Sequence, residues 1–74
     1  MQIYIIKKEE KTDDGFWQSG GIVPCTNLEV AIRERDKMIG ESDEGEFNYS
    51  EDGFIATSNN GWVRFLISAM DVRE

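Results

Sequence analysis

The fold of this chain is decided by residues 47–69, which read FNYSEDGFIATSNNGWVRFLISA. Two turn signals, Asp52-Gly53 and Asn60-Gly61, separate three runs in which apolar and polar residues alternate. Asp-Gly and Asn-Gly pairs between such runs are the strongest short-range signals for a β-hairpin. The stretch therefore predicts a three-stranded antiparallel meander.

The register of this meander follows if each turn is a two-residue loop. Ala56 then lies opposite Tyr49 on one side and Phe65 on the other, and Ile55 lies opposite Leu66. One face collects the side chains that we expect in the core: Phe47, Tyr49, Phe54, Ala56, Val63, Phe65, Ile67 and Ala69. The other face is mostly polar but also carries Ile55, Trp62, Arg64 and Leu66.

Two further strands are predicted before the meander. Residues 2–8, QIYIIKK, are rich in β-branched and aromatic side chains, and apolar groups on both faces predict an interior position in the sheet. Residues 16–23 predict a second strand, with a bulge at Gly20-Gly21 and an end at Pro24.

A helix is predicted between these strands and the meander. Thr26 and Glu29 have the spacing of a capping box, and Cys25 and Val30 have that of a hydrophobic staple, which gives the cysteine a packing role. Gly40 is expected to end the helix. The apolar residues near helical spacing are Leu28, Ala31, Ile32, Met38 and Ile39.

The elements add up to one α+β domain over residues 1–74, in the order β-β-α-β-β-β. We expect a five-stranded, largely antiparallel sheet with one helix on one face. Such a sheet is about 20 Å wide and a helix about 10 Å across, so the second face stays open to water.

Composition narrows the classes of function. The chain has no histidine, which removes the commonest general base and the usual zinc ligands, so we expect no catalytic residue, no metal site and no cofactor. Cys25 is the only cysteine, and no apolar run could span a bilayer. We expect a cytoplasmic protein that does not bind membranes.

The net charge of −7 points to the kind of partner. Fifteen acidic residues against eight basic ones disfavour direct binding of nucleic acid, because phosphates would meet like charge. A basic protein surface is the better-matched partner. The sequence does not indicate the oligomeric state.

The sharpest charge feature is a run of acids without a basic residue: Glu41, Asp43, Glu44, Glu46, Glu51 and Asp52. Three interpretations are open, namely a solvated loop and hairpin tip, a surface that binds protein by mimicking phosphates, and a divalent-metal site. Trp62 and Arg64 on the open face have the composition of a binding hot spot and are candidates for a second contact.

The layout of the whole chain resembles a known family. The start Ile3-Tyr4-Ile5-Ile6-Lys7, the capped helix and the Gly-rich meander ending in a strand near Trp62 resemble small phage-encoded anti-CRISPR inhibitors of type I surveillance complexes. The resemblance implies an inhibitor that acts in the host bacterial cell on a CRISPR-Cas effector subunit, and it assigns no residue roles. The alternative is a structural or regulatory module of a phage or mobile element that binds through its open sheet face.

Overall fold

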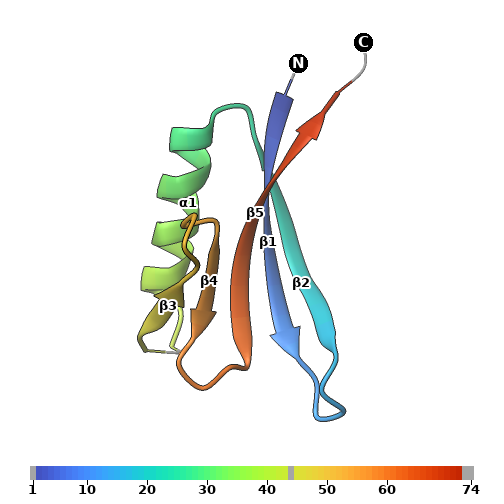
Figure 1. Cartoon of the computed structure of the whole chain (residues 1–74), viewed down its shortest axis with the longest axis vertical. Coiled ribbons are helices and arrows are strands. Elements are labelled where there is room, and N and C mark those ends of the chain that lie inside the picture. Colours follow the sequence, from blue (N-terminus) through green and yellow to red (C-terminus); the bar gives the residue numbers. More distant parts are fainter. Residues whose placement is uncertain (1, 44, 73–74) are drawn as a thin grey trace.

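Five strands and one helix make up the residues that the computed structural model describes, 2–43 and 45–72 (Figure 1). The strands form one antiparallel sheet in the order β2-β1-β5-β4-β3. The predicted α+β class and order of elements are confirmed. Along the chain the elements are β1 (Gln2–Lys11), β2 (Trp17–Cys25), α1 (Leu28–Glu41), β3 (Phe47–Tyr49), β4 (Ile55–Ser58) and β5 (Val63–Asp71).

The predicted register of the meander is also confirmed. Ala56 pairs with Tyr49 of β3 and Phe65 of β5, and Ile55 pairs with Leu66. Most of the predicted core face is buried or half-buried, including Phe47, Phe54, Ala56, Val63, Phe65 and Ile67.

Two residues were wrongly assigned to the core. Tyr49 is 53% exposed, because β3 is the outer strand of the sheet and the side chain that reaches its ring is the guanidinium of Arg35. Ala69 is exposed because β5 extends past β4 there, so that β1 alone pairs with this part of the strand.

β1 occupies an interior position, as the sequence predicted. It pairs with β2 on one side and with β5 on the other, and both Ile5 and Ile6 are buried although they point to opposite faces. The bulge is confirmed as well, since the register changes from Lys8 opposite Gly21 to Glu9 opposite Ser19 and leaves one residue over.

The ends of the helix differ from the prediction. Asn27, not Thr26, is the N-cap, and its side chain accepts a hydrogen bond from the backbone N–H of Glu29 at 2.7 Å. Gly40 lies within α1 and does not adopt a left-handed conformation. Ser42 ends the helix instead, because both its hydroxyl and its N–H donate to the carbonyl of Ile39.

The segment before the helix holds two more corrections. Pro24 does not end β2, which continues to Cys25, since an outer strand tolerates a residue without an N–H. The staple is wrong because Val30 is exposed. Cys25 nevertheless packs in the core, with Ile6, Ala31 and Ile67.

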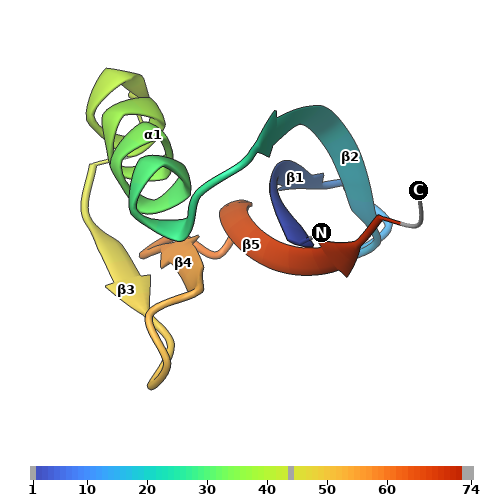
Figure 2. The same cartoon turned by 90° about the horizontal axis from the view of Figure 1, so that it is seen from above.

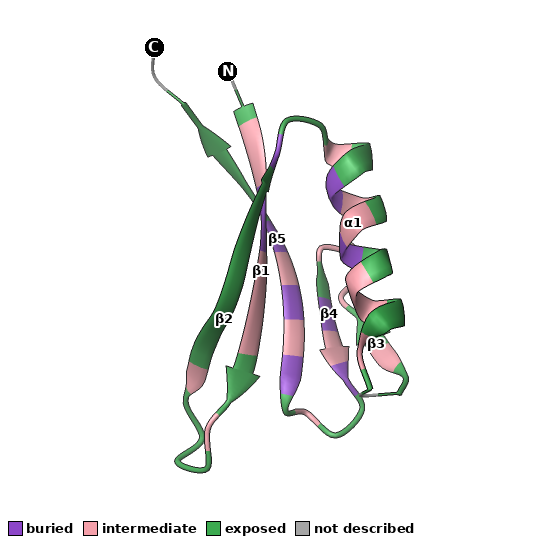
Figure 3. Cartoon of the chain, turned by 180° about the vertical axis from the view of Figure 1, so that it is seen from behind, coloured by how far each residue is buried: buried purple, intermediate pink, exposed green. Residues whose placement is uncertain are grey.

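The helix leaves much of the sheet uncovered. Seen from above, α1 lies on one side of the sheet beside β3 and β4 (Figure 2). Through Ala31 it packs in the core with Ile6 of β1, Cys25 at the end of β2 and Ile67 of β5. Coloured by burial, β2 is exposed along nearly all its length, while β5 alternates between buried and half-buried residues over its first half (Figure 3).

Candidate protein-binding surface

Three hairpin turns are built on one local sequence pattern. Residues 12–16 read TDDGF, 50–54 read SEDGF and 58–62 read SNNGW. In each turn the glycine has a φ of 78° to 87°, which side-chain-bearing residues rarely adopt, and its N–H donates to the carbonyl of the Ser or Thr three residues earlier at 2.9 Å. The pattern [ST]-x-[DN]-G-[FW] therefore sets the conformation and places an aromatic residue directly after each turn.

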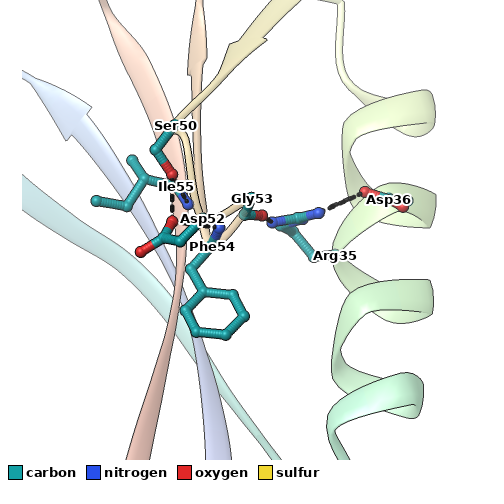
Figure 4. A network of polar contacts seen from close by, with 7 residues as sticks. All are labelled: Arg35, Asp36, Ser50, Asp52, Gly53, Phe54 and Ile55. Carbon is teal, nitrogen blue, oxygen red and sulfur yellow. Dashed lines mark hydrogen bonds and ion pairs between the residues drawn. The ribbon is translucent and has the colours of Figure 1, made fainter.

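The second and third turns also repeat the same side-chain hydrogen bonds. The hydroxyl of Ser50 donates to the carboxylate of Asp52 at 2.6 Å, and the N–H of Phe54 donates to the same oxygen at 2.9 Å (Figure 4). Around Asn60 the corresponding distances from Ser58 and Trp62 are 2.6 and 3.0 Å. These bonds to Asp52, first that from the Ser50 hydroxyl and then that from Phe54, lower the pKa of its carboxyl group.

Three connections lie at the same end of the molecule: the β1–β2 turn, the β4–β5 turn and the loop from α1 to β3 (Figure 1). Hydrogen bonds join them in sequence. The N–H of Lys11 donates to the carbonyl of Trp62 at 2.7 Å, and the N–H of Asn59 donates to the carbonyl of Glu46 at 3.0 Å. Segments far apart in the chain therefore form one continuous surface.

We name this surface the acidic end. Its aromatic residues are unusually open to solvent, since Phe16 is 72% and Trp62 46% exposed. All its acidic residues are exposed too. The acidic end consists of Asp13, Asp14, Phe16, Glu41, Asp43, Glu46 and Trp62.

The structure divides the residues that the sequence singled out. Glu41, Asp43, Glu46 and Trp62 belong to the acidic end, whereas Glu44 lies outside the described residues. Glu51 and Asp52 lie in the β3–β4 turn, at the other end of strand β4 from the acidic end. Asp52 accepts the hydrogen bonds that hold this turn. Asp13, Asp14 and Phe16 were missed, although the repeated turn pattern that contains them is visible in the sequence.

Arg64 already contacts two neighbouring side chains on the open face of the sheet. Its Nε donates to the carboxylate of Glu9 at 2.7 Å, and its guanidinium lies 4.1 Å from the centre of the Trp17 ring. Glu9 and Arg64 are paired across β1 and β5, so the contact follows from the register. The charge of Arg64 is therefore already balanced by a neighbour.

A second engaged arginine, Arg35, was missed by the sequence analysis. Its side chain is almost fully buried, donates from Nη1 to the carbonyl of Gly53, and pairs with Asp36 at 3.1 Å (Figure 4). The guanidinium also lies 5.3 Å from the centre of the Tyr49 ring. Helical spacing places residue 35 on the same side as Ala31 and Met38, which is the signal that could have found it.

We also searched the described residues for pockets and for groups of metal-binding side chains. An open groove of about 260 Å³ lies between the end of α1 and the sheet, and it is lined by Lys8, Met38, Glu41, Ser42 and Phe65. Among the described residues no three acidic or cysteine side chains are grouped so that they could hold a metal ion.

Comparisons with known proteins found no relative. No protein-family model, no curated protein and no solved structure matches this chain. Within residues 2–43 and 45–72, no helix has both the length and the apolar character needed to cross a membrane.

Proposed function

We propose that this chain is a binding protein, not an enzyme, and that it docks its acidic end on a basic protein surface. The observation that carries the proposal is that backbone hydrogen bonds join three separate connections at one end of the molecule, and that these connections carry five exposed acidic residues and two exposed aromatic residues. Carboxylates held on hydrogen-bonded turns present charge to lysine and arginine clusters as phosphates do.

The composition of this end is that of a contact surface. Exposed aromatic side chains such as Phe16 and Trp62 supply large apolar areas with few rotatable bonds, and tryptophan is enriched among residues that dominate binding energy. The surrounding acids would steer a basic partner and raise the association rate. Both contributions lie on one end, where a single partner can reach them.

We further propose a target and a place of action. The resemblance to anti-CRISPR inhibitors leads to a basic, nucleic-acid-binding surface of a type I surveillance complex in the cytoplasm of a bacterial host. Occupying that surface would block the nucleic acid that it normally binds. On this proposal the chain competes with nucleic acid and does not bind it.

A second candidate function is an interaction module that binds through the sheet. The exposure of β2 favours it, since this outer strand has no neighbour on one side. A module of this kind would use backbone pairing, and its binding would depend little on the acidic residues.

The first prediction concerns the charge of the acidic end. A variant carrying Asp13→Asn, Asp14→Asn, Asp43→Asn and Glu46→Gln should associate at least tenfold more slowly with the purified surveillance complex, and its association rate should vary less with salt. The reason is that exposed charges act over about 8 Å at physiological salt and mainly accelerate encounter. The chain is immobilised by a tag at residue 1, because β1 begins at the end opposite to the turns.

The matched control removes the same charge elsewhere. Glu29→Gln, Glu34→Gln, Glu51→Gln and Asp71→Asn also raise the net charge by four but leave the acidic end intact. It should associate nearly as fast as the original chain. Equal association rates for the two variants would reject the acidic end. If the surveillance complex does not bind, capture from a nuclease-treated bacterial lysate, with the first variant as control, tests for another basic partner.

A further inference from the structure

Strand β2 forms a long free edge of the sheet. It lies outermost in the order β2-β1-β5-β4-β3 and is nine residues long, whereas the opposite outer strand, β3, has three residues. Every residue of β2 is exposed except Trp17, which is half-buried, and Cys25, which is buried (Figure 3). Ile22 is 60% exposed. The backbone N–H and C=O groups along such an edge are available to another strand.

The edge carries none of the charge that usually blocks strand addition. The sequence of β2 is WQSGGIVPC, without one charged residue in a chain where 31% of residues are charged. Natural sheets commonly protect an edge with lysine or another charge, with proline or with a bulge. Here Pro24 lies at one end, and the bulge interrupts the strand between Ser19 and Gly21. Residues 17–19 and 21–23 are therefore the parts of the edge left to pair.

In the middle of this segment, two glycines leave room for another strand to come close. Gly20 and Gly21 present no side chain, and nothing lies within 4 Å of the position that a Cβ would take at Gly21. Glycine within a strand is typical of places where a second backbone comes close. Beside the glycines, Ile22 and Val23 offer exposed apolar side chains that a neighbouring strand would cover.

We propose that β2 pairs with β2 of a second copy of this chain, antiparallel and about a twofold axis, so that two sheets join into one. The backbone groups of both edges would be hydrogen-bonded, and the apolar side chains of residues 22 and 23 would be covered by the partner strand at the seam. This proposal does not depend on the proposed function.

Charge is the reason that the partner is a second copy. A basic strand would find no carboxylate on β2 itself, whereas a neutral strand pairs with its own copy without repulsion. The acidic end adjoins the Trp17 end of β2 (Figure 1). Antiparallel pairing over residues 17–23 places the two acidic ends about 20 Å apart, the length of six extended residues. That distance is more than twice the screening length of about 8 Å.

The test compares a charge on the edge with the same charge elsewhere. Sedimentation velocity over micromolar to millimolar concentrations should show the original chain shifting toward twice its mass of 8.5 kDa. Ile22→Lys should weaken this association at least tenfold, because a lysine would lie in the seam. Val30→Lys, at an exposed apolar position on α1, should associate as the original chain does.

Three outcomes would overturn the proposal: a monomer at every concentration, unchanged association of Ile22→Lys, or equal loss in Val30→Lys. Far-ultraviolet circular dichroism establishes that both variants are folded. Hydrogen exchange gives an independent readout, since the outward-facing amides of β2 should become protected as concentration rises. Added salt should leave the dimer unchanged or strengthen it, and weakening by salt would also contradict pairing through a neutral strand.

Discussion

Arg35 ties the helix to the β3–β4 hairpin. It is charged and nearly fully buried, and it meets the Gly53 carbonyl, the Asp36 carboxylate and the face of the Tyr49 ring. A buried charge is tolerated only when its hydrogen-bonding groups are satisfied. This side chain therefore helps to hold the β3–β4 turn against the helix.

We predict that Arg35→Ala lowers the free energy of unfolding by about 3 kcal/mol, because it removes buried packing and leaves the Gly53 carbonyl without this donor. Arg33→Ala, at an exposed position of the same helix, should change it by less than about 0.5 kcal/mol. Urea unfolding measures both. Equal urea midpoints for the two variants would mean that Arg35 does not hold the hairpin.

At Asp52 the lowered pKa predicts a pH dependence of stability. A carboxyl group whose pKa is lower in the folded state stabilises fully above its unfolded value, near 3.8, and loses that contribution as the pH falls through the folded value. Asp52→Asn should keep the turn, because Asn60 accepts the equivalent bonds in the next turn. It should also reduce the loss of stability below pH 4.

Unfolding midpoints of the original chain and of Asp52→Asn between pH 2 and pH 6 provide the measurement. Glu51→Gln is the control, since it is Asp52, and not Glu51, that accepts the hydrogen bonds from the hydroxyl of Ser50 and the N–H of Phe54. Identical pH profiles for the original chain and Asp52→Asn would rule out this role for the carboxylate.

Among the elements, β5 carries the centre of the core. Phe65 is buried between α1 and the sheet, and its ring lies 5.7 Å from that of Phe47. Phe65→Ala should lower the free energy of unfolding by about 3–5 kcal/mol, which is a large part of the stability of a chain of 74 residues, since small domains have little stability in reserve. Thr57→Ala on the opposite face should cost far less.

Thermal or chemical unfolding of these two variants tests which face of the meander is the core. Thr57 is half-buried and pairs with Arg64 on the side away from the helix, so its methyl group contributes little packing. Losses of equal size would be incompatible with the register described above.

The elements that could be predicted are those fixed by local signals. The Asp52-Gly53 and Asn60-Gly61 turns set the register of the meander, because each determines which residues lie opposite one another. The helix ends were less predictable, since Thr26 and Asn27 are both good caps and Ser42 competes with Gly40 at the other end. Local chemistry does not decide between neighbouring candidates.

At the scale of the whole molecule, contacts between distant segments escaped prediction. The acidic end joins residues 13–16 to Glu41, Asp43, Glu46 and Trp62, and this proximity requires β1 to lie next to β5. Turn signals do not specify the order of strands in a sheet. The hydrogen bond from Arg35 to Gly53 escaped prediction for the same reason, because the two residues are 18 positions apart, whereas helical spacing could have placed Arg35 on the buried side of α1.

The pairing of the first strand with the last has a consequence for synthesis and folding. β1 and β5 are paired from Gln2 opposite Asp71 to Glu10 opposite Val63, so the centre of the sheet cannot close until the last strand has left the ribosome. Closing so long a loop slows folding, and the β4–β5 hairpin can form earlier because its partners are close in sequence. During translation the nascent β1–β2 hairpin must therefore wait with its apolar side chains uncovered, which makes this interval the one in which chaperones or aggregation would act.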